Sequence, residues 1–155
     1  MRYLLNYLYH FFVSNSRHGT HSPFVYALAE KALYNPSYES TYKVQFPAGF
    51  HPKYLNHLNK VLSFWQIPGL SERLEDVDAQ AYWVCNTNAS REDLLEKISQ
   101  GKIIVLDRPY QASQKKLWEN LIADDRVIVS LNFFHYGILL NRKGQRKEDF
   151  LLRYV

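Results

Sequence analysis

Apolar positions in the first third of the chain recur at helical spacing. Ser22 followed by Pro23 is typical of a helix start, with a hydroxyl cap and a proline at the first helical position. The apolar residues predicted to share one face of this helix are Phe24, Ala27, Leu28 and Ala32. A second helix is expected after Pro52, and Ile67-Pro68-Gly69 ends it. Its apolar stripe is Tyr54, Leu55, Leu58, Val61, Leu62 and Trp65. Residues 1–66 are therefore expected to be mostly helical.

Between these two helices, polar and apolar residues alternate. Tyr42, Val44 and Phe46 alternate with Lys43 and Gln45, which indicates a short strand over Thr41 to Phe46.

From about residue 80 the pattern changes to that of an α/β fold. Strands are predicted at Ala81 to Cys85, Ile103 to Leu106, Val127 to Leu131, Ile138 to Leu140 and Phe150 to Tyr154. Ser90 and Asp93 form a possible capping box for a helix that Gly101 closes. Another helix is predicted over Ser113 to Ile122, with Leu117, Trp118, Leu121 and Ile122 apolar. We interpret residues 80–155 as the α/β part of a single domain that spans residues 1–155.

Composition and charge narrow the class of protein without naming a function. The chain has 155 residues, of which 46% are hydrophobic and 22% are charged, so it can bury a core and is not expected to be disordered. The net charge of +4 is too small to indicate a nucleic-acid-binding protein. Cys85 is the single cysteine, which excludes an intramolecular disulfide and fits a reducing cytosol. The apolar stretch Met1 to Val13 is too short to span a bilayer and is interpreted as an amphipathic helix. We therefore expect a cytoplasmic protein with no membrane segment.

Three stretches of the chain resemble one known family. His18 to Tyr26 (HGTHSPFVY) resembles the N-terminal signature of class I S-adenosylmethionine-dependent methyltransferase-like proteins. Lys102 to Tyr110 (KIIVLDRPY) is similar to the fifth strand and acidic turn of that family, and Val127 to Tyr154 is similar to its closing antiparallel hairpin. The resemblance implies a truncated Rossmann-like mixed sheet with a C-terminal antiparallel hairpin.

The middle of the chain departs from this family. Class I methyltransferases hold their cofactor at a glycine-rich turn after the first strand, where the backbone approaches the ligand closely. The six glycines of this chain stand alone, and no G-x-G pair occurs. Between Phe46 and Tyr82 there is no strand–turn–helix unit to supply such a turn. The first three strands of the family sheet are thus expected to be missing, and no bound cofactor is expected.

Few side chains are candidates for chemistry, and we predict no catalytic residue. Asp107 and Cys85 are the candidates for contact with a cofactor, because each follows a strand near its carboxyl end. The neighbouring Arg108 makes Asp107 a poor cation ligand, so an ion pair is the preferred interpretation. Packing is the preferred role of Cys85, which has no base or motif around it.

Histidines and basic residues are the remaining candidates. His18 and His21 could contribute to a metal site, with His10 or His51 as further ligands, but two imidazoles rarely suffice and a structural corner is preferred. Arg142, Lys143, Arg146 and Lys147 form a basic cluster, which we interpret as a solvated hairpin tip.

We expect a non-catalytic, shortened methyltransferase-like protein that acts through binding or self-association. One alternative is an active S-adenosylmethionine-dependent methyltransferase with an atypical or dimer-shared site. The other alternative is a nucleic-acid-binding domain. Loss of three strands would leave Tyr82 to Cys85 at a sheet edge. Either Thr41 to Phe46 pairs with that edge, or two copies form a homodimer, which the 15% aromatic content also favours.

Overall fold

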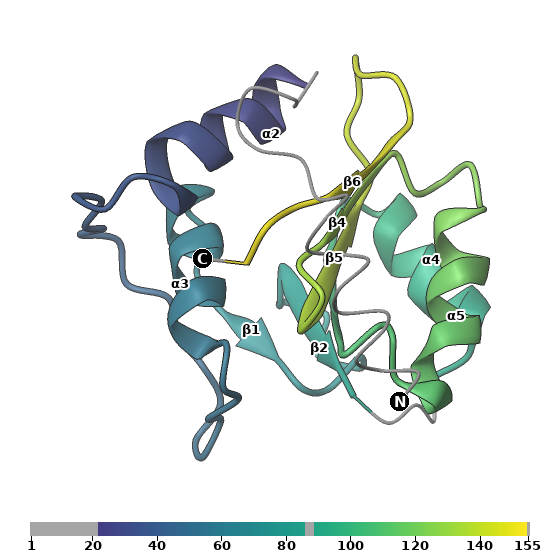
Figure 1. Cartoon of the computed structure of the whole chain (residues 1–155). Coiled ribbons are helices and arrows are strands. Elements are labelled where there is room, and N and C mark those ends of the chain that lie inside the picture. Colours follow the sequence, from purple (N-terminus) through teal and green to yellow (C-terminus); the bar gives the residue numbers. More distant parts are fainter. Residues whose placement is uncertain (1–21, 86–88, 155) are drawn as a thin grey trace.

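The computed structural model describes residues 22–85 and 89–154, which form an α/β fold around one six-stranded sheet (Figure 1). The helical segments are α2 (Pro23–Leu28), its π-helical continuation η2 (Ala29–Leu33), α3 (Leu55–Phe64), α4 (Arg91–Ser99) and α5 (Ala112–Ile122). The strands are β1 (Leu70–Ser71), β2 (Ala81–Val84), β3 (Ile103–Asp107), β4 (Val129–Asn132), β5 (Tyr136–Leu140) and β6 (Glu148–Leu151).

The sheet is mixed, with the strand order β1-β2-β3-β5-β4-β6. Strands β1, β2 and β3 run parallel, so their carboxyl ends meet at one edge of the sheet. Strand β5 is antiparallel to both of its neighbours and lies between β3 and β4, and Asp107 pairs with Tyr136 across β3 and β5. Strand β6 is parallel to β4 and forms the last strand of the sheet. The predicted antiparallel pair of strands near the C-terminus is therefore confirmed.

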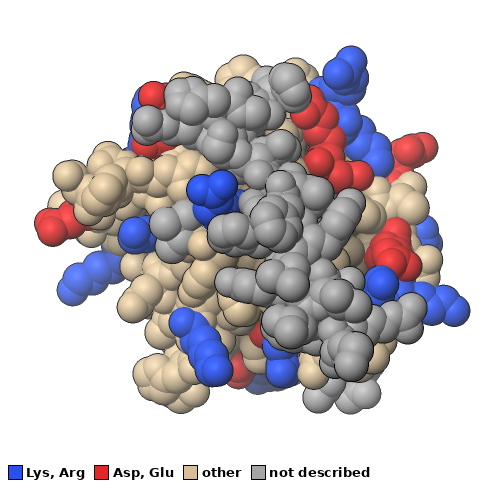
Figure 2. Space-filling view, in the orientation of Figure 1, with Lys and Arg blue, Asp and Glu red and all other residues tan. Residues whose placement is uncertain are grey.

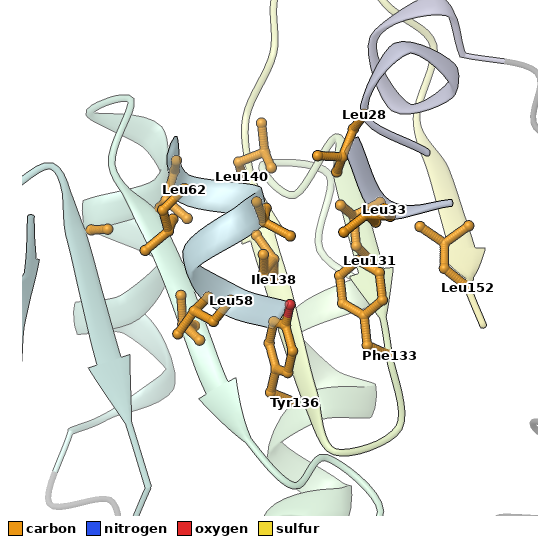
Figure 3. Close-up of a cluster of buried hydrophobic side chains, with 14 of the residues drawn as sticks. Leu28, Leu33, Leu58, Leu62, Leu131, Phe133, Tyr136, Ile138, Leu140 and Leu152 are labelled. Atoms are coloured by element: carbon orange, nitrogen blue, oxygen red, sulfur yellow. The ribbon is translucent and has the colours of Figure 1, made fainter. Parts of the chain in front are cut away.

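Helices cover both faces of the sheet. Helices α2 and α3 lie on one side and α4 and α5 on the other (Figure 1). Alternate residues of β3 face the two layers: Val105 belongs to the cluster with α2 and α3, whereas Ile104 and Leu106 belong to the cluster with α4 and α5. Burial on both faces explains why residues 103–106 form one continuous apolar run. Figure 3 shows the first cluster, in which Leu58 of α3 lies against Tyr136 of β5.

Local signals at the helix ends are confirmed. The Ser22 hydroxyl accepts a hydrogen bond from the backbone N–H of Val25 at 3.4 Å, and the Ser90 hydroxyl accepts one from Asp93 at 3.1 Å. Gly101 ends α4 with a φ of 86°, a left-handed conformation that favours glycine. These caps depend on neighbouring residues alone, which is why the sequence predicts them well.

The apolar face predicted for the first helix is partly wrong. Leu28 and Ala32 are buried as expected, but Phe24 and Ala27 are half-buried. Val25, Ala29 and Leu33 take the inward positions instead. Val25, Leu28, Ala29 and Ala32 follow the i, i+3, i+4, i+7 spacing of one helix face, so the face is rotated from the predicted one already in the α-helical part. The π-helical segment from Ala29 adds Leu33 to the buried residues.

The predicted strand over residues 41–46 is wrong, and so is its pairing with the Tyr82 strand. Gln45 forms a single parallel bridge with Gly69, and the strand next to β2 is β1, which pairs Leu70 with Ala81 and Ser71 with Tyr82. The sequence did not indicate β1 as the neighbour of β2, because a strand of two residues is too short to show an alternation of polar and apolar residues. The last strand, Glu148–Leu151, also begins and ends earlier than the predicted Phe150 to Tyr154.

Most aromatic residues in the described part of the chain are either buried or pack half-buried against the core. Among the described residues, the large hydrophobic side chains that are exposed are Val77 and Tyr154, which are 70% and 36% exposed. Tyr82 is fully buried, and its hydroxyl donates to the backbone oxygen of Asp76 at 2.6 Å. The aromatic content of the described part therefore does not by itself indicate an uncovered surface.

None of the helices in the described ranges is long and apolar enough to cross a membrane. The stretch Met1 to Val13, predicted to be an amphipathic helix, lies outside the described residues.

Candidate binding site

A pocket of about 620 Å³ lies at the carboxyl ends of β2 and β3. Its walls come from the segment before α3, from the turns after β1 and β3, from β2, and from the turn between β4 and β5. The lining residues are Gly49, Phe50, His51, Pro52, Lys53, Tyr54, Glu72, Trp83, Asp107, Arg108 and His135. Ligands of open α/β sheets bind at this edge, and the volume is within the range of small-molecule sites.

Asp107 lies in this pocket, but its carboxylate is already engaged. The Tyr54 hydroxyl donates to Oδ1 at 2.5 Å, and Arg108 Nε donates to Oδ2 at 2.9 Å. The Asp107 side chain is buried, while that of Arg108 is half-exposed. Arg108 has a φ of 44°, which costs strain for a residue with a side chain. The predicted ion pair between Asp107 and Arg108 is thus confirmed.

Tyr54 links the end of β3 to β2. It lies in the turn after Pro52, immediately before α3 begins at Leu55. Its hydroxyl accepts a hydrogen bond from Trp83 Nε1 at 2.9 Å while donating to Asp107. Burial and the neighbouring Asp107 carboxylate raise the pKa of Tyr54, so its hydroxyl stays protonated and keeps donating.

Aromatic rings form the apolar part of the pocket wall. Phe50 packs edge-on against Trp83, with ring centroids 5.0 Å apart and an interplanar angle of 87°. Phe46 stacks behind Phe50 at 5.7 Å. Because the indole N–H of Trp83 already has Tyr54 as its acceptor, this wall offers mainly ring carbon atoms to a ligand.

Basic side chains also line the pocket. The backbone N–H of Arg108 donates to the backbone oxygen of His135 at 3.0 Å, which joins the turn after β3 to the turn before β5. Burial and the nearby positive charge of Lys53 lower the pKa of His135, so this imidazole is neutral near pH 7. Lys53 and Arg108 line the pocket together with the neutral imidazole of His135, and we call these three residues the basic wall.

A buried histidine lies behind the pocket rather than in it. His57 of α3 shares a hydrogen bond of 2.6 Å with the Tyr136 hydroxyl, and its Nε2 is buried with no hydrogen-bond partner. Burial, chiefly, lowers the pKa of His57 to about 3. The sequence reasoning missed this residue, although position 57 falls on the apolar stripe of its helix, between Tyr54 and Val61. We interpret His57 as a neutral core residue.

The other predicted site residues are separate from the pocket. Cys85 is half-buried at the end of β2, does not line the pocket, and its backbone oxygen accepts a hydrogen bond from the Gln114 amide. His18 and His21, like His10, lie outside the described residues. His51 lines the pocket, but within the described ranges no group of three or more metal-ligating side chains occurs.

Part of the basic cluster near the C-terminus has structural contacts. The Arg142 guanidinium lies over the Phe24 ring at 4.0 Å, and Lys147 Nζ donates to the backbone oxygens of Asp124 and Val127. On the face shown in Figure 2, basic and acidic side chains are interspersed rather than gathered by sign. The described part of this face therefore shows no basic patch of the kind that binds nucleic acid.

Comparison of the chain with protein-family models, with curated proteins and with solved structures found no match.

Proposed function

We propose that this chain is a shortened, non-catalytic methyltransferase-like protein that acts by binding a small molecule in the pocket at the carboxyl ends of β2 and β3. Two features support the kinship. Strands β2 and β3 run parallel, and the hairpin of β4 and β5 closes the sheet with β5 antiparallel beside β3. This is the antiparallel ending that the sequence resemblance implies.

The observation that carries the proposal is the composition of the turns at the carboxyl edge. The turns after β1, β2 and β3 all lie between Gly69 and Gly137, and the single glycine in that interval, Gly101, lies before β3 at the opposite edge. A methyltransferase turn needs glycine so that its backbone can reach the cofactor. The residues present therefore do not fit S-adenosylmethionine bound in the usual manner.

The state of Asp107 supports the same conclusion. Both of its carboxylate oxygens already accept hydrogen bonds, from Tyr54 and from Arg108. Breaking either contact would leave a buried charge less well compensated, which is costly. Asp107 thus holds the side chains of Tyr54 and Arg108 in place in the pocket wall.

Isothermal titration calorimetry with S-adenosylmethionine and S-adenosylhomocysteine tests this proposal. We expect no heat of binding from either compound at millimolar concentration. Micromolar affinity for either would contradict the non-catalytic interpretation and support the alternative of an active methyltransferase. Under that alternative, Asp107→Asn would weaken the interaction, whereas Asp78→Asn, a substitution at an exposed position that does not line the pocket, would not.

Self-association is a second element of the proposal, favoured by the edge of the sheet. Strand β3 pairs with all four residues of β2, but on the other side of β2 the short strand β1 pairs with Ala81 and Tyr82 only. On that side, Trp83 and Val84 have no strand beside them within the described part of the chain. Such an edge invites pairing with another chain. Light scattering at micromolar concentration is expected to show a dimer, and a strict monomer would remove this element while leaving the pocket unaffected.

A further inference from the structure

The charged groups of the pocket are arranged unevenly across the sheet. Glu72 follows β1, Trp83 belongs to β2, Arg108 follows β3 and His135 precedes β5. The first and last of these strands are three strand spacings apart in the order of the sheet, which is roughly 14 Å. The pocket therefore has Glu72 at one end and the basic wall at the other, with aromatic rings between them.

Within the basic wall, Lys53 is the side chain whose positive charge can pair with a negative group of a ligand. Asp107 compensates the charge of Arg108 at 2.9 Å, and His135 is neutral near pH 7. Lys53 is exposed and forms no ion pair with any described residue. Lys53 and His135 line the same pocket, and the positive charge of Lys53 contributes to the lowered pKa of that imidazole. A cation at one end of a pocket lined by aromatic carbon atoms is suited to a ligand with a flat apolar body and a negative group.

We propose that the pocket binds a small aromatic molecule that carries a carboxylate or a phosphate, with the anionic group against Lys53 and the ring against Trp83 and Phe50. This inference rests on the proposed function, because it specifies the ligand of the same pocket. The polar atoms near the rings are already paired, since Trp83 donates to Tyr54 and Tyr54 donates to Asp107. When the ring of the ligand enters the pocket, it therefore leaves no polar atom of Trp83 or Tyr54 without a hydrogen-bond partner. The anionic group then sets the orientation of the ligand.

Four compounds with one phenyl ring and different charge test the inference: phenyl phosphate, phenylacetate, the neutral 2-phenylethanol and the cationic 2-phenylethylammonium. Calorimetry on the full chain is expected to show that the two anions bind about fivefold more tightly than the neutral alcohol, since an ion pair with an exposed lysine is worth up to about that factor. The cation is expected to bind most weakly of the four. The ratio of the affinities for phenyl phosphate and phenylacetate shows which of the two anionic groups the pocket binds more tightly.

Lys53→Gln is the decisive variant, because Lys53 is exposed and its replacement leaves the core untouched. It is expected to weaken the binding of both anions by about fivefold and to leave the binding of the neutral alcohol unchanged. The matched control is Lys116→Gln, which removes the same charge from an exposed position on α5, across the sheet from the pocket. Equal or tighter binding of the neutral or cationic compound, equal effects of the two variants, or no binding of any compound at millimolar concentration would each overturn this inference. The proposed function fails by a separate result, micromolar binding of S-adenosylmethionine or S-adenosylhomocysteine.

Discussion

Gly137 in the middle of β5 is predicted to be a packing requirement of the Trp118 indole. A Cβ placed on Gly137 would lie 2.5 Å from Cη2 of Trp118 and closer still to Cζ3. Trp118 is 6% exposed and lies on α5, which packs on this face of the sheet, so its ring has little space into which to move. Gly137 is flanked in the sheet by Leu106 and Asn132, which also restricts movement of the strand. The substitution Gly137→Ala therefore forces two packed elements apart.

The size of the effect follows from two opposing terms. Alanine in place of glycine within a strand is favourable by about 0.5–1 kcal/mol, because the unfolded chain loses conformational freedom. Overpacking a core by one methyl group costs about 1–3 kcal/mol. Because the added Cβ would lie far inside the van der Waals distance, the cost of overpacking is near the upper end of this range and exceeds the gain from replacing glycine. Gly137→Ala is therefore expected to destabilise the protein by about 2 kcal/mol.

A double-mutant cycle isolates this contact. Trp118→Ala alone is expected to cost about 3–5 kcal/mol, because it removes a buried ring and leaves a cavity. In the Trp118→Ala background the overlap no longer exists, so adding Gly137→Ala should be neutral or stabilising. The coupling energy between the two positions is then about 2 kcal/mol or more. Urea denaturation followed by far-ultraviolet circular dichroism measures all four proteins, since this signal does not depend on the tryptophan that is removed.

Three results would refute the reasoning. If Gly137→Ala left the unfolding midpoint of the parent protein unchanged, the close approach of Trp118 to β5 would be wrong. If Gly137→Ala destabilised both backgrounds equally, the glycine would be required for another reason, such as local backbone conformation. A melting curve unaffected by Trp118→Ala would contradict the position of the indole on the inner face of α5.

Three further predictions concern the buried polar groups and one helix cap. Tyr54→Phe is expected to cost about 2–3 kcal/mol in urea denaturation, because it leaves the Asp107 carboxylate and the Trp83 indole N–H each without one partner; an unchanged midpoint would contradict this network. Folding lowers the pKa of His57 from 6.5 to about 3, so only the unfolded chain takes up a proton on this residue as the pH falls through that interval. The free energy of unfolding therefore falls from pH 6.5 downwards, by about 3 kcal/mol between pH 7 and pH 4. His57→Asn is expected to flatten this pH dependence, which denaturation series at several pH values measure. Equal slopes for the two proteins would show that His57 is not buried in its neutral form. Ser90→Ala removes a helix cap on α4 and is expected to lower stability by about 1 kcal/mol, and a thermal midpoint equal to that of the parent would show that the hydroxyl does not cap the helix.

The position of Asp107 in the pocket followed from local pattern together with one general rule. The apolar run of residues 103–106 predicts a buried strand, and the residue after a parallel strand lies at the ligand-binding edge of an α/β sheet. The partners of Asp107 did not follow in this way. Tyr54 is 53 residues away along the chain and appeared in the sequence as one member of an apolar helical stripe. Cys85 satisfies the same rule as Asp107, yet it lies outside the pocket, because the rule places backbone ends and says nothing of where side chains point.

The sequence by itself determined the elements whose signals lie within a few neighbouring residues. Ser22 and Ser90 cap helices because a hydroxyl reaches the N–H three residues on, and Gly101 ends a helix because it tolerates a positive φ. The tertiary structure decided which segments meet. It placed the two-residue strand β1 beside β2, although Thr41 to Phe46 has the stronger strand pattern. It buried His57 and placed Lys53 and His135, which are far apart along the chain, in the walls of one pocket. Pairing of distant segments depends on the packing of both faces of the sheet at once, and no window of neighbouring residues contains that information.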